Sequence, residues 1–455
     1  MRFYGRENET ETLRWQLSRA RETRVARMVV VTGRRRVGKT TLIRKAFEAS
    51  EVPLIYCYVT EMSDEVAMAQ FLVAQATQRL ALRYPPTLSK LADAIEWLLE
   101  ISQTHPFVLV LDECHLLDRM TGFWSALQRV WDLGKAGSQM LLIMSGSVQT
   151  ALERIFGNQN EPLFGRADQT LVLQPFTTTL LKQIFEDAVS APGNPRDLLL
   201  FYGVTGGVAR YVEFLVDADA VTQERLLDLL FSDRGSQLQK EGDLLLANEF
   251  RLSAPLYRSI LLRLAAGRSK RTELQDGQST DISPYLARLE TLYGLVSRVQ
   301  PFLEPSEKRK TRYRVADPYM RFWLRFFCDD EVKALMELQQ WPVLRERTEA
   351  ELSSFLGRTL EDWFRWQFLE SGLWTPVGCW WDRRGENEID LIALNRQDRR
   401  IVFAEVKSQA EKLNEGKLRR KAEAFLEAHG EYRDWQTTFL GLTPDDMLTS
   451  PWKIE

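Results

Sequence analysis

A continuous apolar run leads into a glycine-rich loop in the stretch Val29-Val30-Val31-Thr32-Gly33-Arg34-Arg35-Arg36-Val37-Gly38-Lys39-Thr40-Thr41. The run predicts a β-strand covered on both faces, and Gly33 and Gly38 occupy the two glycine positions of the pattern G-x-x-x-x-G-K-[ST]. Backbone N–H groups of such a loop attract an anion, as does the N-terminal end of the helix expected to begin at Lys39. The stretch therefore predicts a P-loop that holds the phosphates of ATP.

The residues of the loop have separate expected roles. Lys39 is expected to neutralise the β- and γ-phosphates, and the Thr40 hydroxyl is expected to ligate Mg²⁺. The other residues expected at the nucleotide are Gly33, Arg34, Arg35, Arg36, Val37, Gly38 and Thr41. The three arginines could add phosphate contacts or stay in solvent, and their spacing leaves both interpretations open.

A second apolar run, residues 107–111, ends in two carboxylates. This is the Walker B pattern, in which Asp112 is expected to hold Mg²⁺ through water and Glu113 to orient the attacking water. The alternative is a pair of acids that caps a strand. A third run, residues 140–144, ends at Ser145, and a hydroxyl at that edge of an open α/β sheet could sense the γ-phosphate. Ser147 has the same possible role, or is the N-cap of the next helix.

Two arginines outside the loop are also candidates. Arg166 could reach the γ-phosphate of a neighbouring copy as an arginine finger, which fits a homo-oligomer, although most arginines are solvated or ion-paired. Arg6 belongs to the turn of residues 3–9, which could lie against the adenine. The same turn could equally be a helix N-terminus with favourable acids at Glu7 and Glu9.

The composition sets limits on the class of protein. The 455 residues suggest about three domains, and 44% hydrophobic with 27% charged residues is ordinary for a globular protein. A net charge of -3 means that contact with nucleic acid needs local basic patches. The four scattered cysteines argue against a disulfide framework or a structural zinc site. Without an apolar run of membrane length, we expect a cytoplasmic protein with no membrane contact.

Residues 246–327 have a sequence pattern that differs from that of the preceding part of the chain. Helical patterns at 257–266, 269–273 and 283–292 precede two strand-like runs, 295–299 and 312–315, which flank Lys308, Arg309 and Lys310. Three short helices and a two-stranded wing resemble a winged helix-turn-helix, whose third helix and wing commonly contact DNA. Arg288 is the obvious base-reading group on the third helix. The alternative is a winged helix that serves only as a protein interface.

The last part of the chain carries a second group of candidate catalytic residues. Asp390 lies in one expected strand and Glu405-x-Lys407 in the next, which matches the PD-(D/E)XK nuclease pattern. Strand alternation places Glu405 and Lys407 on one face. Asp390 and Glu405 are expected to bind Mg²⁺, and Lys407 to position or activate the water that attacks a phosphodiester. Glu361, on an upstream helix, is a further candidate ligand.

The order of several motifs resembles the archaeal-type ATPase family, P-loop ATPases related to AAA proteins and signal-transducing NTPases. The motifs are FYGRENE, GRRRVGKT, VLVLDE, SGS, PLFGR and GGVARYVEF. In that family a Gly-Gly turn is usually followed by x-Pro-x-Tyr, and here Ala209 replaces the proline. The resemblance leaves Arg210 as a candidate sensor of the γ-phosphate. The stretch CWWDRRGENEIDLIAL…IVFAEVK also resembles the uncharacterised domain that often follows such ATPases, with Val406 where a cysteine is frequent.

These patterns together predict an α/β protein of four parts: a P-loop ATPase core with a parallel sheet (1–177), a helical lid (178–245), a winged helix-turn-helix (246–327) and a restriction-endonuclease-like domain (328–455). We expect ATP and Mg²⁺ as cofactors, and ATP-controlled DNA binding or cleavage as the function. One alternative is an ATP-driven switch whose last domain binds DNA without cutting. Another is a helicase-like translocase, suggested by the D-E-x-H sequence from Asp112 to His115.

Overall fold

The computed structural model describes residues 1–189, 193–250, 254–304, 310–383 and 385–453. It divides into two compact units. The ATPase unit is Tyr4–Pro175, and the second unit is Phe176–Glu455 together with Met1–Phe3. Among the described residues, no helix combines the length and the apolar character needed to cross a membrane.

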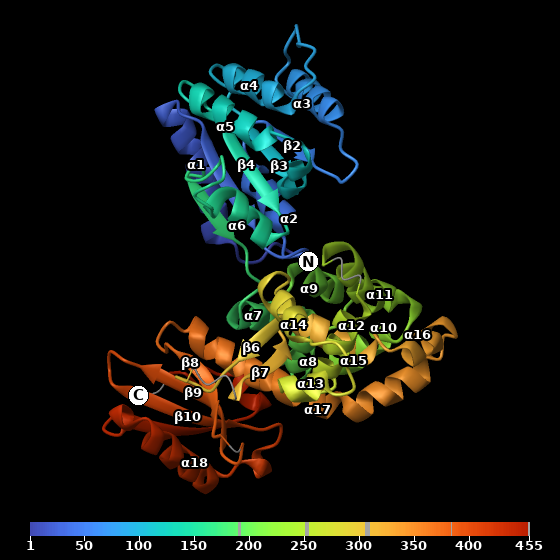
Figure 1. Ribbon diagram of the computed structural model, residues 1–455, viewed down its shortest axis with the longest axis vertical. Helices are drawn as coiled ribbons and strands as arrows, with labels where there is room; N and C mark the ends of the chain where they lie inside the picture. The colour runs from blue at the N-terminus through green and yellow to red at the C-terminus, as the bar shows by residue number, and fades with distance from the viewer. Residues whose placement is uncertain (190–192, 251–253, 305–309, 384, 454–455) are drawn as a thin grey trace. The chain divides into compact units, whose positions relative to one another are not determined.

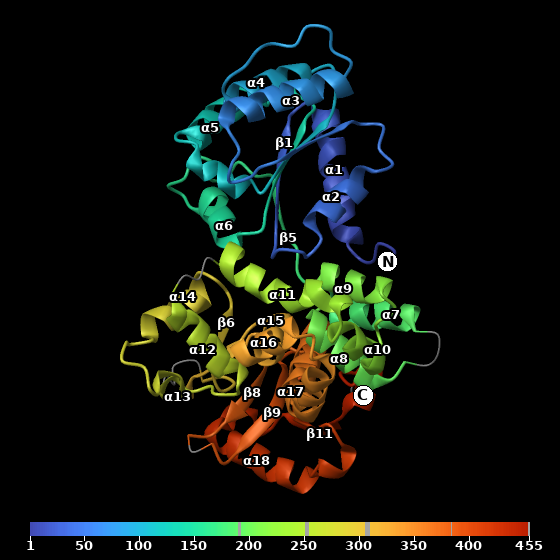
Figure 2. The same cartoon turned by 90° about the vertical axis from the view of Figure 1, so that its right-hand side faces the viewer.

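The ATPase unit is built on a five-stranded parallel sheet in the order β2-β3-β4-β1-β5. The strands are β1 (Arg27–Thr32), β2 (Leu54–Tyr58), β3 (Val108–Asp112), β4 (Leu141–Gly146) and β5 (Gln169–Val172). Its helices are α1 (Glu7–Thr23), α2 (Lys39–Phe47), α3 (Glu65–Arg79), α4 (Leu91–Ile101), α5 (Phe123–Gly134) and α6 (Gln149–Gly157). Helices α1 and α2 lie on one face of the sheet and α3 to α5 on the other (Figure 2).

Cover on both faces explains the apolar runs of the central strands. Every residue of β3 and β4 is buried, and in β1 only Arg27 is not. The parallel α/β sheet expected from these runs is confirmed. The fifth strand ends at Val172, and Phe176 donates its backbone N–H to the Gly207 carbonyl oxygen at 2.7 Å within the second unit.

The second unit begins with helices α7 (Thr178–Ala188), α8 (Pro195–Thr205), α9 (Ala209–Asp217), α10 (Gln223–Leu230) and α11 (Ser236–Leu244). Then come α12 (Pro255–Ala265), α13 (Arg271–Gln275), α14 (Ser283–Thr291) and an antiparallel hairpin of β6 (Val296–Val299) and β7 (Arg312–Val315). Helices α15 (Pro318–Phe326), α16 (Asp330–Glu337) and the long α17 (Trp341–Glu370) follow. The three predicted helices and two strands of this region are therefore present.

The C-terminal sheet has the order β11-β10-β9-β8. Its strands are β8 (Val377–Trp381), β9 (Glu388–Asn395), β10 (Arg400–Val406) and β11 (Gln436–Leu442). The first three are antiparallel neighbours, whereas β11 runs parallel to β10, so helix α18 (Glu415–Ala428) carries the chain between them. Figure 1 shows this sheet with α18 along one face.

Helix α17 connects several parts of the second unit. Its Trp363 ring packs against Tyr202 of α8, with the ring centroids 5.2 Å apart. At its last residue, Glu370 accepts hydrogen bonds from the backbone N–H and the hydroxyl of Thr178, at 2.9 and 2.6 Å. Thr178 is the first residue of α7, so the end of α17 is bound to the start of the unit. The predicted division of this unit into a lid, a winged helix and a nuclease-like part stays a prediction.

Candidate functional site

The P-loop lies between β1 and α2, as its sequence predicts. Gly33 has a φ of 147°, and an added Cβ there would lie 2.5 Å from the Leu173 carbonyl oxygen, so the loop needs glycine at this point. Lys39 is buried, and its ammonium group donates to the carbonyl oxygens of Gly33 and Arg34 at 2.8 and 3.2 Å. The lysine is therefore held inside the loop, where its charge faces the position expected for the phosphates.

The residues expected to hold Mg²⁺ meet at the ends of α2 and β3. The Thr40 hydroxyl donates to the buried Asp112 carboxylate at 3.1 Å. A hydroxyl and a carboxylate at this separation are hard oxygen ligands of the kind that Mg²⁺ takes. The two side chains therefore fit the cation that accompanies ATP.

Tyr56, on the neighbouring strand β2, was not singled out by the sequence. Its hydroxyl donates to the same Asp112 oxygen and lies 3.4 Å from the Thr40 hydroxyl. Burial raises the pKa of Tyr56, and the negative charge of Asp112 raises it further, so the hydroxyl stays a donor. The only sequence signal for this contact is the alternation of side chains along a strand, which fixes the face of the sheet on which Tyr56 lies. Asp112, on the adjacent strand, lies on that same face.

We expect Tyr56→Phe to lower the Mg²⁺ concentration needed for half-maximal ATP hydrolysis by roughly fivefold, the equivalent of one hydrogen bond of about 1 kcal/mol. Without the hydroxyl, Asp112 loses a partner that competes with the cation. Titration of ATPase activity with Mg²⁺ measures the effect. Tyr58→Phe is the matched control, because Tyr58 is exposed on the same strand. An unchanged or higher Mg²⁺ requirement would contradict this role.

The Glu113 carboxylate is held by the end of β4. Its Oε2 accepts hydrogen bonds from the backbone N–H and the hydroxyl of Ser147 at 3.0 and 2.9 Å, and His115 Nδ1 lies 3.4 Å away. The prediction that Ser147 caps α6 is wrong, since the N-cap position is Val148 and no side chain caps it. Ser145 is buried, and its hydroxyl has no hydrogen-bond partner within the described ranges.

The three arginine candidates lie in different surroundings. Arg6 pairs with Glu9 at 3.1 Å and donates to the Gln174 carbonyl oxygen, which ties the start of α1 to the chain after β5. Arg166 forms a two-pronged ion pair with Asp132 of α5, at 2.8 Å for the shorter contact. Arg210 belongs to the second unit and pairs with Glu213 at 2.7 Å. Their roles toward nucleotide stay predictions.

In the second unit, Asp390 and the Glu405-x-Lys407 pair converge as predicted. Asp390 Oδ2 accepts hydrogen bonds from the Val406 backbone N–H at 2.9 Å and from the Lys407 ammonium at 3.0 Å. The same ammonium lies 3.5 Å from Glu405 Oε1. Two carboxylates thus share one cationic nitrogen, which indicates that the space between them favours a cation.

Burial would lower the pKa of Lys407, but Asp390 and Glu405 outweigh it and raise the pKa above its ordinary value. The side chain is therefore protonated at neutral pH. Glu405 is also reached by the Asn414 backbone N–H at 3.1 Å and by Lys421 at 3.7 Å. Lys407 is consequently suited to act as a positive charge and hydrogen-bond donor, and not as a base.

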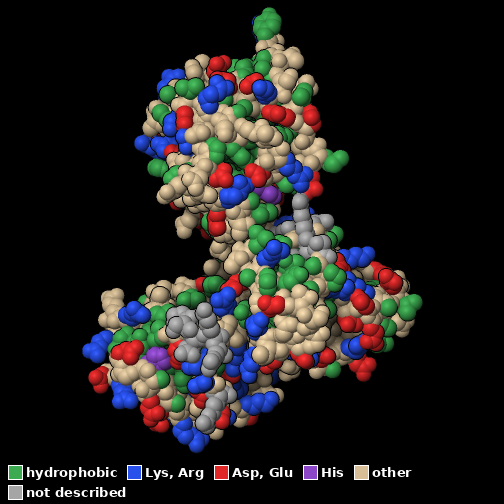
Figure 3. Space-filling view, viewed as in Figure 1, with side chains coloured by type: hydrophobic (Ala, Val, Ile, Leu, Met, Phe, Trp, Pro, Cys, Tyr) green, Lys and Arg blue, Asp and Glu red, His purple; other side chains and the backbone are tan. Residues whose placement is uncertain are grey.

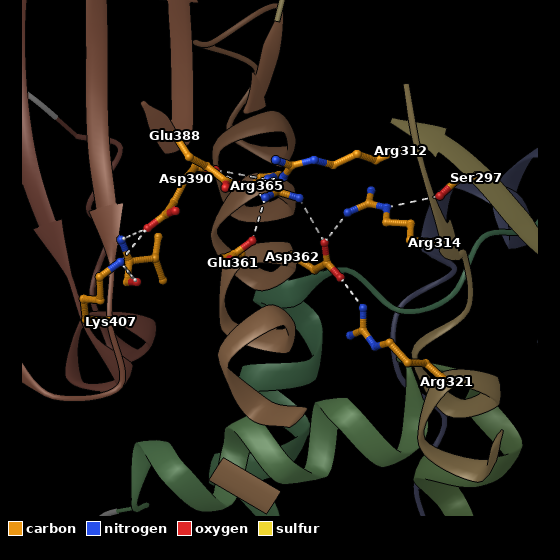
Figure 4. Close-up of polar contacts among 11 residues, drawn as sticks. Ser297, Arg312, Arg314, Arg321, Glu361, Asp362, Arg365, Glu388, Asp390 and Lys407 are labelled. Atoms are coloured by element: carbon orange, nitrogen blue, oxygen red, sulfur yellow. Dashed lines mark hydrogen bonds and ion pairs between the residues drawn. The ribbon is translucent and has the colours of Figure 1, made fainter. Parts of the chain in front are cut away.

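Glu361 lies on α17, and the side chain of Arg365 contacts both Glu361 and Asp390. Arg365 donates to Glu361 at 2.9 Å and to the Asp390 backbone oxygen at 3.3 Å (Figure 4). Burial raises the pKa of Glu361, with further increase from the charge of Asp390. In the part of the chain that the structure describes, no group of three or more His, Cys, Asp or Glu side chains is arranged to hold a metal ion. Glu361 is thus not joined to Asp390 and Glu405 as one ligand set.

Basic side chains in the described part of the β6–β7 hairpin are paired with acidic ones. Lys310 pairs with Glu304 and is mostly buried, and Arg312 pairs with Glu388 of the C-terminal sheet at 2.7 Å. Lys308 and Arg309 lie outside the described residues. Arg288, on α14, is exposed. On the face in Figure 3, basic and acidic side chains of the described residues are interspersed over the second unit. Contact with DNA through the hairpin and α14 stays a prediction.

Known families match two parts of the chain. Residues 2–143 match the AAA ATPase domain, and residues 323–420 match archaeal and bacterial proteins of unknown function. An uncharacterised protein of Methanocaldococcus jannaschii is 26% identical over 416 residues, which cover 89% of this chain and 87% of that protein.

Solved structures share the fold. A Walker-type ATPase of Pyrococcus abyssi has 19% sequence identity and a TM-score of 0.51, and the match covers 71% of this chain and 96% of that one. P-loop ATPases of this kind use ATP with Mg²⁺, and the Thr40 hydroxyl and the Asp112 carboxylate are ligands that suit this cation. Residues 2–143 therefore match the AAA ATPase domain and share the fold of P-loop ATPases, and residues 323–420 match proteins of unknown function.

Proposed function

We propose that this protein is an ATPase that couples its nucleotide state to DNA and cleaves phosphodiester bonds with its C-terminal domain. One observation supports the cleavage most strongly: Asp390, Glu405 and Lys407 converge from β9 and the end of β10 with one ammonium shared by two carboxylates. The order α17, β8, β9, β10, α18, β11 places a helix with Glu361 before the three antiparallel strands. The ATPase motifs and this cluster lie on one chain, which supports control of one by the other.

The proposed chemistry is hydrolysis of a phosphodiester. The water oxygen forms a bond to phosphorus and releases a proton to solvent, the bond between phosphorus and the leaving oxygen breaks, and the leaving oxygen takes up a proton from solvent. Asp390 and Glu405 would hold a divalent cation, which supplies polarisation of the scissile phosphate. Lys407 would orient the water and offset the developing negative charge. The exposed α14, with Arg288, would contact the DNA.

A second candidate function is an ATP-driven switch that binds DNA without cutting it. The observation that favours it is the pairing of every carboxylate of the cluster with a cationic side chain: Lys407 with Asp390 and Glu405, and Arg365 with Glu361. Such pairs neutralise the site, and a cation must displace them before it can bind.

Incubation of the full chain with plasmid DNA and Mg²⁺, with ATP or with no nucleotide, tests the proposal. We expect cleavage by the parent in at least one nucleotide state and none by Asp390→Ala, because the cation loses a carboxylate ligand. Asp398→Ala is the control, since Asp398 lies in the exposed turn after β9. Binding of the plasmid without cleavage in either state would favour the switch.

A further inference from the structure

Glu113 follows the last residue of β3 and has an uncommon backbone conformation. Its φ of 55° and ψ of 38° lie in the left-handed region, which residues other than glycine rarely adopt. Such a conformation persists only where the surrounding structure offsets its cost, and it is frequent at functional sites. The contacts of the Glu113 carboxylate identify the residue that holds the side chain.

One carboxylate oxygen of Glu113 is bound twice by the same residue. Ser147 donates both its backbone N–H and its hydroxyl to Oε2, at 3.0 and 2.9 Å. His115 Nδ1 lies 3.4 Å from that oxygen, and Gly146 leaves room for the ring, since a Cβ there would lie 3.1 Å from Nδ1. Two hydrogen bonds to Oε2 restrain the side-chain torsions, so the other oxygen, Oε1, has a defined direction.

Ser147 is itself held between regular elements. It directly follows β4, in which every residue is buried, and it lies two residues before α6. Arg154 of α6 pairs at 2.7 Å with Asp118, which belongs to the short helix after Glu113. Asp118 also accepts a hydrogen bond from the Trp124 indole at 3.0 Å. The segment after β4 and the segment after β3 therefore contact each other at two points, of which the contact between Ser147 and Glu113 is one.

The Ser147 hydroxyl is not available to a phosphate group while it contacts Glu113. A hydroxyl has a single proton to donate, and Ser147 donates it to the carboxylate. Ser145 differs, because its hydroxyl is buried and has no hydrogen-bond partner among the residues that the structure describes. The two serines of the SGS motif thus have different surroundings, and the predicted contact with the γ-phosphate suits Ser145 better than Ser147.

We propose that Ser147 is a positioning residue for ATP hydrolysis: its two hydrogen bonds hold Glu113 Oε2, so that Oε1 is directed to accept a hydrogen bond from the attacking water. A carboxylate that is oriented before ATP binds does not have to be ordered during the reaction. Ser147 therefore acts through Glu113 and not on the nucleotide. The inference rests on the ATPase part of the proposed function and does not depend on cleavage of DNA.

Steady-state ATP hydrolysis by the full chain tests this role. Ser147→Ala removes the hydroxyl and keeps the backbone N–H, so kcat should fall roughly tenfold, the size expected for one hydrogen bond to a charged group, while KM stays within about twofold. Ser147→Thr restores a hydroxyl and should recover most of the rate. Ser125→Ala is the matched control, because Ser125 is exposed on α5, and it should hydrolyse ATP like the parent.

Two further measurements separate positioning of Glu113 from a direct contact with the γ-phosphate. In the Glu113→Gln background, Ser147→Ala should not lower the residual rate further, because the carboxylate through which it acts is already absent. Fluorescent analogues of ATP and ADP should each bind Ser147→Ala as they bind the parent, whereas loss of a γ-phosphate contact weakens ATP binding alone. Thermal melting identifies a variant that fails to fold, and Ser147→Cys, whose thiol is a weaker donor, then replaces Ser147→Ala.

The outcomes separate this inference from the proposed function. Slow hydrolysis by Glu113→Gln together with a parental kcat for Ser147→Ala overturns the inference and leaves the role of Glu113 in place. A rise of kcat in Ser147→Ala, a selective loss of ATP affinity, or a further loss of rate in the Glu113→Gln background also overturns it. Absence of ATP hydrolysis by the parent, with and without DNA, overturns the ATPase function and the inference together.

Discussion

Replacement of Lys39 by alanine is expected to weaken ATP binding by about 100-fold or more, the loss of two charge-assisted contacts to phosphate oxygens. The buried ammonium already lies within the P-loop, bonded to two of its carbonyl oxygens. Titration with a fluorescent ATP analogue measures the affinity. Lys45→Ala, on the same helix but exposed and paired with Glu48, should bind ATP normally.

Glu113→Gln separates binding from hydrolysis at the same site. The amide keeps the shape of the side chain but cannot accept a proton, so we expect normal ATP affinity with hydrolysis reduced about 10² to 10³-fold. Turnover by Glu113→Gln at the rate of the parent would contradict the role of Glu113 in orienting water.

The second large effect is expected at Lys407. Lys407→Ala should lower DNA cleavage about 10² to 10³-fold, because it removes a charge that stabilises the transition state. It should nevertheless bind Mn²⁺ at least as tightly as the parent, because the ammonium between Asp390 and Glu405 competes with the metal ion. Asp390→Ala should lose both properties. Calorimetry of Mn²⁺ binding beside a plasmid-cleavage assay distinguishes the two variants.

Two controls accompany the Lys407→Ala variant: a lysine substituted at another position and a different metal ion. Lys412→Ala, exposed beyond the end of β10, should cleave like the parent. Ca²⁺ should bind without supporting cleavage, since its longer and looser coordination aligns water and phosphate poorly. Equal cleavage by the parent, Asp390→Ala and Lys407→Ala would assign the activity to another site or to a contaminant.

The parts of the structure that the sequence predicts best are those in which the chemistry needs neighbouring residues. Gly33, Gly38, Lys39 and Thr40 must be close in the chain because one turn has to surround a phosphate, and Asp112 follows an apolar run because its strand is covered on both faces. Asp390, Glu405 and Lys407 were predictable for a related reason, since strand alternation fixes their faces.

The contacts that the sequence could not supply depend on tertiary packing. Arg314 and Arg321 lie 48 and 41 residues before Asp362, and nothing in either segment marks an arginine for a buried partner. The contact of Tyr56 with Asp112 depends on which strands are neighbours, and the sequence does not give that order. A sequence gives charges without their partners, so the pairing of Lys310 with Glu304 could not be predicted from it.

The contact between Glu370 and Thr178 bonds the last residue of α17 to the segment that follows the ATPase unit. The helix has 30 residues, and at 1.5 Å per residue it is about 45 Å long. The chain leaves the ATPase unit at Pro175 and is bound to the end of this helix only three residues later. The helix that is bonded to the start of the second unit is therefore the helix that carries Glu361 and Arg365.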